Sequence, residues 1–178
     1  QWRELLRFAE SNAPLPTAFA LGVTISLHGL RYNCAALIAG GKVRGLVPKE
    51  KLPTYDVFYE GRNFARGFAG QREEFRGVPV GDAIFSFDFG TVALEVCEDL
   101  WSADGPMRRR TYAGAELVVN LSASPFRVGF VSTRREIIAT RAGDHQCTVA
   151  YANAVGANDG LIFDGGGYIN QNGRWVLD

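Results

Sequence analysis

The sequence predicts an α/β fold, because runs typical of strands alternate with patterns typical of helices along most of its 178 residues. Hairpin signals such as Gly40-Gly41 and Asn172-Gly173 argue against a purely parallel sheet. Hydrophobic residues make up 47% of the chain and charged residues 21%, which is the balance of a globular protein. This length suits one hydrophobic core and is short for two ordinary domains.

Strands are expected wherever apolar or β-branched residues run together between turn signals. Residues 91–96 are the clearest case, and 83–87 is expected to pair with them across Asp88-Phe89-Gly90. The expected strands are 18–27, 32–39, 43–47, 83–87, 91–96, 116–121, 147–154, 161–163, 168–170 and 175–177.

Two helices are expected from spacing and punctuation. Trp2, Leu5, Leu6 and Ala9 fall at helical spacing, and Asn12-Ala13-Pro14 ends that pattern. A second helix is expected after Pro106, before the strand at 116–121.

A further helix is expected to begin at Thr133-Arg134-Arg135-Glu136, which fits a capping box. Val131, Ile138 and Ala142 are expected on its buried face. Residues 54–81 are polar, aromatic and Gly-rich, and a loop of this length suggests a functional segment.

Charge and cysteine content exclude several classes of protein. Nineteen basic and nineteen acidic residues give no net charge, so neither a nucleic-acid nor a membrane partner is expected. Cys34, Cys97 and Cys147 are widely spaced in apolar context, which fits neither a disulfide framework nor a zinc site and predicts a reducing, cytoplasmic location. Gln1 is not an initiator methionine, so the chain is expected to be a piece of a longer protein.

Cys97 is the strongest candidate for chemistry, because it directly follows the strand at 91–96 and precedes a turn signal. A thiol at such a junction sits on a rigid support at the sheet edge, where open α/β sheets place their reactive groups. The alternative is that Cys97 is one more small buried hydrophobe.

Lys49 stands at a second strand end, after 43–47. A lysine ammonium close to a thiol favours the thiolate and can donate to a tetrahedral oxyanion, with the backbone N–H of Glu98 as a second donor. Lys51 is the competing candidate, and a solvated surface charge is the alternative for either lysine.

The motifs that carry these residues resemble the nitrilase superfamily of carbon–nitrogen hydrolases. They more closely resemble the glutaminase domain of glutamine-dependent NAD+ synthetase. The resemblance covers PKEKLPTYDVFYEGR at 48–62, VCEDLW at 96–101, NLSASPF at 120–126, NAVGAND at 153–159 and FDG at 163–165.

The resemblance implies a nitrilase-like four-layer α-β-β-α sandwich, present here as a truncated domain. Residues 1–178 are then a partial glutaminase domain that lacks both of its ends, and the synthetase domain is absent from the chain. In the implied reaction, Cys97 attacks the side-chain amide of L-glutamine and forms a thioester, and ammonia is released. Ammonia then serves a separate ATP-dependent domain that amidates deamido-NAD.

The resemblance implies no cofactor for this domain, whereas the parent enzyme uses ATP, Mg²⁺ and deamido-NAD. The implied partners are the ammonia-accepting synthetase domain and further copies in a homo-oligomer. Two alternatives remain open: a stand-alone amidase or nitrilase acting on another small amide, and a non-catalytic interaction module of the same fold.

In the family the triad is Glu-Lys-Cys, and Lys49 and Cys97 match two of its positions. The matching glutamate lies before Gln1, so the 178-residue chain alone is expected to hydrolyse glutamine negligibly. Glu60 matches a glutamate that steadies the lysine, and a salt bridge to Arg62 is the alternative.

Four residues are expected to form the substrate pocket. Tyr55 and Ser124 match residues that hold glutamine, the Glu98 side chain is placed to meet the ammonium, and Phe58 forms pocket wall. The alternatives are core aromatics for Tyr55 and Phe58, a turn residue for Ser124, and an exposed side chain for Glu98. Phe130 stands where many relatives carry a lysine, and Arg127 is a candidate replacement for carboxylate recognition.

Overall fold

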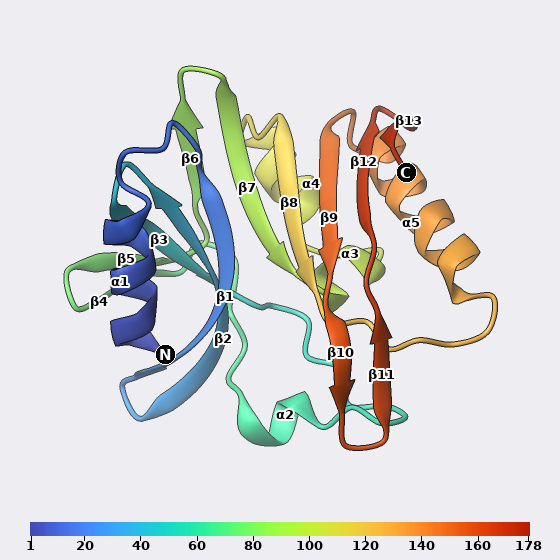
Figure 1. Ribbon diagram of the computed structural model, residues 1–178, viewed down its shortest axis with the longest axis horizontal. Coiled ribbons are helices and arrows are strands. Elements are labelled where there is room, and N and C mark those ends of the chain that lie inside the picture. Colours follow the sequence, from blue (N-terminus) through green and yellow to red (C-terminus); the bar gives the residue numbers. More distant parts are fainter. The chain divides into compact units, whose positions relative to one another are not determined.

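The computed structural model describes residues 1–178 and divides into two compact units, Gln1–Ala83 and Ile84–Asp178 (Figure 1). Each unit has its own sheet and its own cluster of buried apolar side chains. The mixed α/β class predicted from the sequence is confirmed. The single core suggested by the chain length is not, because the buried apolar side chains form two clusters, one in each unit.

The first unit holds a five-stranded sheet in the order β1-β2-β3-β5-β4. All its pairs are antiparallel except β3 with β5. Its elements are α1 (Trp2–Ser11), β1 (Phe19–Leu27), β2 (Leu30–Ala39), β3 (Lys42–Pro48), α2 (Glu60–Asn63), β4 (Arg72–Phe75) and β5 (Val78–Gly81).

The core of the first unit lies where α1 packs on the sheet. Leu5 and Ala9, one helical turn apart, belong to one cluster with alternating side chains of two strands. These are Val23 and Ile25 of β1 and Cys34, Ala36 and Ile38 of β2. The opening helix was predicted from this spacing, and its end at Asn12 is confirmed.

The segment 54–81, expected to be a loop, contains α2 and the β4–β5 hairpin. β4 reads Arg-Glu-Glu-Phe and is mostly exposed, so it shows no apolar alternation for a sequence pattern to detect. Its turn is Arg76-Gly77, with φ of 54° and 80°. Positive φ at both positions is the geometry of a tight hairpin, but arginine is an unusual residue there.

The second unit holds a six-stranded sheet in the order β13-β12-β9-β8-β7-β6 and a separate β10–β11 hairpin. Its elements are β6 (Ile84–Phe87), β7 (Gly90–Val96), α3 (Glu98–Trp101), α4 (Met107–Tyr112), β8 (Leu117–Ser122), α5 (Phe130–Asp144), β9 (Thr148–Asn153), β10 (Val155–Asn158), β11 (Leu161–Asp164), β12 (Gly167–Gln171) and β13 (Arg174–Leu177).

The three central strands β7, β8 and β9 run parallel, as Figure 1 shows, with Val96 beside Leu121 and Leu121 beside Ala152. Their carboxyl ends therefore share one edge of the sheet, the edge at which open α/β sheets bind ligands. The segments that follow β7 and β8 begin with Cys97 and Ala123 and carry much of the motif resemblance.

Helix α5 differs from its prediction at its start. It begins at Phe130 after Gly129, whose φ is 78°, and no side chain caps it. Thr133 lies inside the helix, so the predicted capping box is wrong. Val131 is exposed rather than buried, and the buried face is Arg134, Ile138 and Ala142 at a four-residue spacing.

The β10–β11 hairpin was not fully predicted, since only residues 161–163 were expected to form a strand there. All four residues of β10 are exposed, so no alternating pattern marks it. Asp159-Gly160 joins the two strands and was the available turn signal. No helix of the chain has both the length and the apolar character needed to cross a membrane.

Candidate active site

Cys97 sits in a sharp turn between β7 and α3, with φ of 46° and ψ of −100°. A positive φ is uncommon for a residue with a side chain, and such strain gathers at functional sites. A nucleophile on a strained strand-to-helix turn is held away from the sheet with its reactive atom accessible. Cys97 is half-buried, and the turn is hereafter called the Cys97 elbow (residues 96–98).

Backbone hydrogen bonds hold the elbow on both sides. The Cys97 N–H donates to the Leu121 carbonyl of β8 at 2.9 Å, and the Leu100 N–H donates to the Cys97 carbonyl at 3.1 Å. The Val96 N–H donates to Asp99 Oδ2 at 3.1 Å, and Asp99 is only 1% exposed. Asp99 thus reaches back from the helix to the strand end, and sequence reasoning assigned it no role.

The other two cysteines are structural. Burial raises the pKa of the Cys34 thiol to about 12 and, with a smaller effect from the nearby Glu95, raises that of Cys147 to about 11. Both thiols are therefore protonated and inert at neutral pH. Among the three, Cys97 alone is not fully buried.

Ser124 is a buried residue after β8, held by Asn153 at the end of β9. The Ser124 N–H donates to Asn153 Oδ1 at 2.8 Å, and Asn153 Nδ2 donates to the Ser124 carbonyl at 3.1 Å. This double contact fixes Ser124 at the sheet edge that also carries the elbow. Asn153 belongs to the NAVGAND motif, but no function was predicted for it.

The Asn153 amide also links this edge to an ion pair whose arginine is buried. Asn153 Nδ2 donates to Asp164 Oδ1 at 3.3 Å, and Arg134 donates to both oxygens of the same carboxylate at 3.0 and 3.2 Å. The hydrogen bond from Arg134 lowers the pKa of Asp164 below its ordinary value. Arg134 is therefore an ion-pair partner and not a solvated helix charge.

Lys49 and Glu60 meet in the first unit. Lys49 directly follows β3 and is 2% exposed, and its Nζ lies 2.5 Å from Glu60 Oε2 at the start of α2. Of the two partners considered for Glu60, the structure pairs it with Lys49, while the Arg62 guanidinium lies over the Tyr59 ring at 5.1 Å. Lys51, the competing lysine, is more exposed than Lys49.

The backbone around Lys49 is held closely. The Lys49 N–H donates to the Asn33 carbonyl, and the Gly67 N–H donates to the Lys49 carbonyl, both at 2.8 Å. A Cβ on Gly67 would stand 2.7 Å from the Pro48 carbonyl oxygen, so this close approach requires glycine. The Lys49 ammonium is therefore held in a fixed position at the end of β3.

The remaining predicted residues have the following surroundings. Tyr55 and Phe58 contact each other edge to face with centroids 5.7 Å apart, and Tyr55 is 55% exposed, so it is not a core aromatic. Glu98 is half-buried in the first turn of α3. Phe130 stacks on Trp101 at 5.1 Å with Arg127 over its ring at 5.6 Å.

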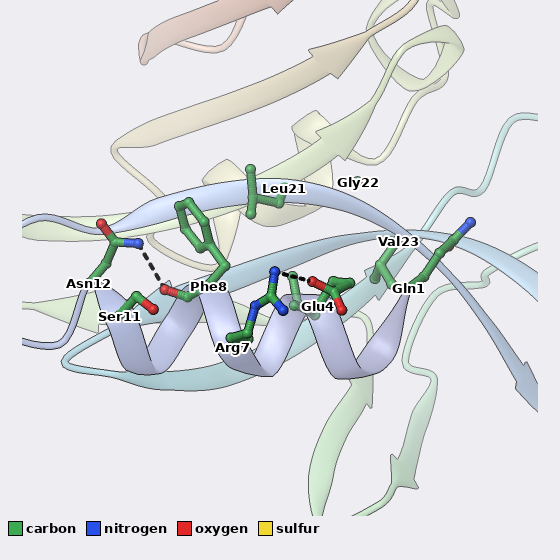
Figure 2. Close-up of a pocket in the computed structure, with 10 residues that line it drawn as sticks. Gln1, Glu4, Arg7, Phe8, Ser11, Asn12, Leu21, Gly22 and Val23 are labelled. Atoms are coloured by element: carbon green, nitrogen blue, oxygen red, sulfur yellow. Dashed lines mark hydrogen bonds and ion pairs between the residues drawn. The ribbon is translucent and has the colours of Figure 1, made fainter.

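A pocket of about 570 Å³ lies elsewhere in the first unit, between α1 and β1 (Figure 2). Figure 2 shows its lining side chains, including the exposed Glu4–Arg7 ion pair at 2.9 Å. None of the predicted site residues lines this pocket. No group of three or more His, Cys, Asp or Glu side chains gathers anywhere in the chain in a way that could hold a metal ion.

No protein-family model matches the chain. It is 40% identical over 134 residues to the glutamine-dependent NAD(+) synthetase of Aquifex aeolicus, a match that covers 75% of this chain and 22% of that protein. The chain therefore spans less than a quarter of the length of this relative.

Two solved structures share the fold. A glutamine-dependent NAD(+) synthetase from Cytophaga hutchinsonii superposes with a TM-score of 0.88 at 28% identity, covering 99% of this chain and 29% of that one. A carbon–nitrogen hydrolase from Helicobacter pylori superposes with a TM-score of 0.79 at 20% identity, covering 99% of this chain and 63% of that one, and at this identity it shows the fold alone. The resemblance predicted from the motifs is thus confirmed: the homologues of this chain are glutamine-dependent NAD(+) synthetases, and its fold is that of the nitrilase-like carbon–nitrogen hydrolases.

Proposed function

We propose that the chain is the glutamine amidohydrolase part of a glutamine-dependent NAD+ synthetase. The observation that carries this proposal is the Cys97 elbow, which presents a half-buried thiol at the carboxyl edge of the parallel strands. The homologues, which are synthetases named for their dependence on glutamine, support the choice of substrate.

In the proposed reaction, Cys97 Sγ forms a bond to the side-chain carbonyl carbon of glutamine. The carbon–nitrogen bond then breaks, and the thiol proton passes to the leaving nitrogen, so that ammonia departs and a glutamyl thioester remains. Water hydrolyses the thioester to glutamate and restores the thiol.

Lys49 is proposed to favour the thiolate form of Cys97 and to stabilise the oxyanion that forms when Cys97 attacks. Glu60 accepts a hydrogen bond from the Lys49 ammonium, with Nζ 2.5 Å from Oε2, and the two further N–H donors of the ammonium are proposed to point at the substrate. The backbone N–H of Glu98 is the proposed second donor. This arrangement requires Lys49 and Cys97 to act on the same amide.

Glutamine is proposed to be held by four side chains. Tyr55 and Ser124 contact the substrate, Phe58 forms pocket wall, and the Glu98 carboxylate meets the ammonium group. The double hydrogen bond between Ser124 and Asn153 supports a fixed position for Ser124.

The chain is further proposed to be a partial glutaminase domain of a longer protein, since it spans 22% of one synthetase relative and 29% of another. The third member of the triad and the synthetase domain then lie outside residues 1–178. That domain would take the ammonia and use ATP, Mg²⁺ and deamido-NAD. We place the protein in the cytoplasm, as a homo-oligomer.

The test is Cys97→Ala in the intact protein, with NAD+ synthesis measured from glutamine and from free ammonia. Synthesis from glutamine should be abolished and synthesis from ammonia retained, while Cys147→Ala, at a buried cysteine of the same unit, should retain both. Loss of both activities in Cys97→Ala, or continued synthesis from glutamine, would contradict the proposal. Hydrolysis of other small amides without NAD+ synthesis would favour a stand-alone amidase, and failure of a glutamine-analogue electrophile to label Cys97 would favour an interaction module.

A further inference from the structure

Asn120 is a fully buried amide on β8, on the same face of the strand as Val118 and Ser122. Its Nδ2 donates to the backbone carbonyl of Cys97 at 3.4 Å. A buried amide in an apolar strand is costly unless both of its ends are hydrogen-bonded. The hydrogen bond to the elbow therefore satisfies the nitrogen end of this buried amide.

Ser122 fixes the direction in which this amide points. The Ser122 Oγ donates to Asn120 Oδ1 at 2.7 Å, two residues along the same strand. The Cys97 carbonyl can only accept a hydrogen bond, so the amide nitrogen must face it. With its oxygen taken by Ser122 and its nitrogen by Cys97, the Asn120 side chain has one orientation.

The Cys97 carbonyl belongs to the same planar peptide unit as the Glu98 N–H, and the two groups point in opposite directions. Fixing the carbonyl therefore fixes the direction of the N–H. This control matters at Cys97, because its backbone is in a conformation that few residues with side chains adopt. The Leu100 N–H binds the same carbonyl at 3.1 Å, so the peptide is held from two sides.

We propose that Asn120, oriented by Ser122, is a positioning residue for the oxyanion donor. It holds the peptide between Cys97 and Glu98 so that the Glu98 N–H points at the oxygen that becomes charged during attack. This inference rests on the proposed function, in which Cys97 attacks glutamine. Because the donor acts on the developing charge, losing its alignment lowers kcat and leaves KM nearly unchanged.

The experiment compares two reactions of Cys97 in the intact protein. Glutamine hydrolysis passes through an oxyanion, whereas alkylation by iodoacetamide displaces iodide without forming one. Asn120→Asp keeps the shape of the side chain but replaces the donor, so kcat for glutamine should fall by about a hundredfold. The alkylation rate and KM should stay close to those of the wild type. Asn170→Asp is the matched control, since Asn170 is equally buried in the same sheet.

Two variants at Ser122 that add no charge keep the test decisive if Asn120→Asp fails to fold. Ser122→Ala removes the hydroxyl that orients Asn120 and should lower kcat by about tenfold without changing alkylation. Ser122→Thr restores a hydroxyl and should restore kcat.

Three results would overturn the inference. The first is that kcat falls no further in Asn120→Asp than in Asn170→Asp, and the second is that kcat and the alkylation rate fall in equal proportion in Asn120→Asp. The third is that Ser122→Thr does not restore the kcat lost in Ser122→Ala. Failure of the proposed function looks different, because then the wild type itself does not hydrolyse glutamine through Cys97.

Discussion

Arg134 and Asp164 form an ion pair in which the guanidinium is fully buried and donates to both carboxylate oxygens. The arginine comes from the core face of α5 and the aspartate from the end of β11. Through Asn153 the carboxylate also contacts the segment that holds Ser124. The pair therefore ties the helix to the edge of the sheet that carries the proposed chemistry.

Removing Asp164 should destabilise the protein strongly, because it leaves the Arg134 charge buried without its partner. Asp164→Asn is expected to lower the free energy of unfolding by about 2–4 kcal/mol. Glu4→Gln breaks the exposed Glu4–Arg7 pair and should cost no more than about 1 kcal/mol. Urea unfolding of both variants measures the difference, and equal costs would refute the role given to the Arg134–Asp164 pair.

The same pair predicts how stability depends on pH. The hydrogen bond from Arg134 lowers the pKa of Asp164 below its ordinary value of 3.8. A carboxyl with a lowered pKa contributes its stability above the ordinary value and loses it as the pH falls through the folded-state value. The gap in unfolding free energy between wild type and Asp164→Asn should thus be constant above about pH 5 and shrink below about pH 4. A gap that persists unchanged at lower pH would contradict this.

Glu60→Gln should impair glutamine hydrolysis, because it removes the carboxylate that holds the Lys49 ammonium in place. In the intact protein we expect kcat for glutamine to fall by about a hundredfold while synthesis from free ammonia is retained. Arg62→Gln, two residues away in the same short helix, is the control and should leave kcat near the wild-type value. If both variants lose the same activity, Glu60 acts only through the local structure of α2.

The cysteines should differ sharply in reactivity. At pH 8 a thiol with a pKa of about 11 is ionised in about one molecule in a thousand, and Cys34, with a pKa of about 12, is ionised still less. Brief treatment with iodoacetamide should therefore modify Cys97 first, as read by mass spectrometry of the peptides. Modification of Cys34 or Cys147 at the same rate would show that the fold opens on this timescale.

The two candidate residues that directly follow strands β7 and β3 were found from the sequence alone. Cys97 and Lys49 follow runs whose apolar character and turn signals are local, so both could be found without knowing the fold. The hairpin at Asn172-Gly173 was predicted for the same reason, and both residues have positive φ.

The residues that hold the site were not predicted, because their partners come from distant segments. From the sequence, Arg134 is either a solvated helix charge or an ion-pair partner, and its partner Asp164 lies 30 residues later in the chain. Asn120 lies in an apolar strand, and only the parallel register of β7 and β8 places its amide at the Cys97 carbonyl. Supporting contacts of this kind depend on tertiary structure, which no local pattern encodes.

The central claim is that the Lys49 ammonium acts on the Cys97 thiol, and the pH dependence of Cys97 alkylation in the intact protein tests it most directly. Lys49→Met keeps the length of the side chain and removes its charge, so alkylation at pH 7 should slow by about tenfold or more, and the rate should reach half its maximum at higher pH. Lys51→Met should follow the wild-type curve. If Lys49→Met follows that curve as well, the two groups do not share a site and the proposed hydrolase mechanism is wrong.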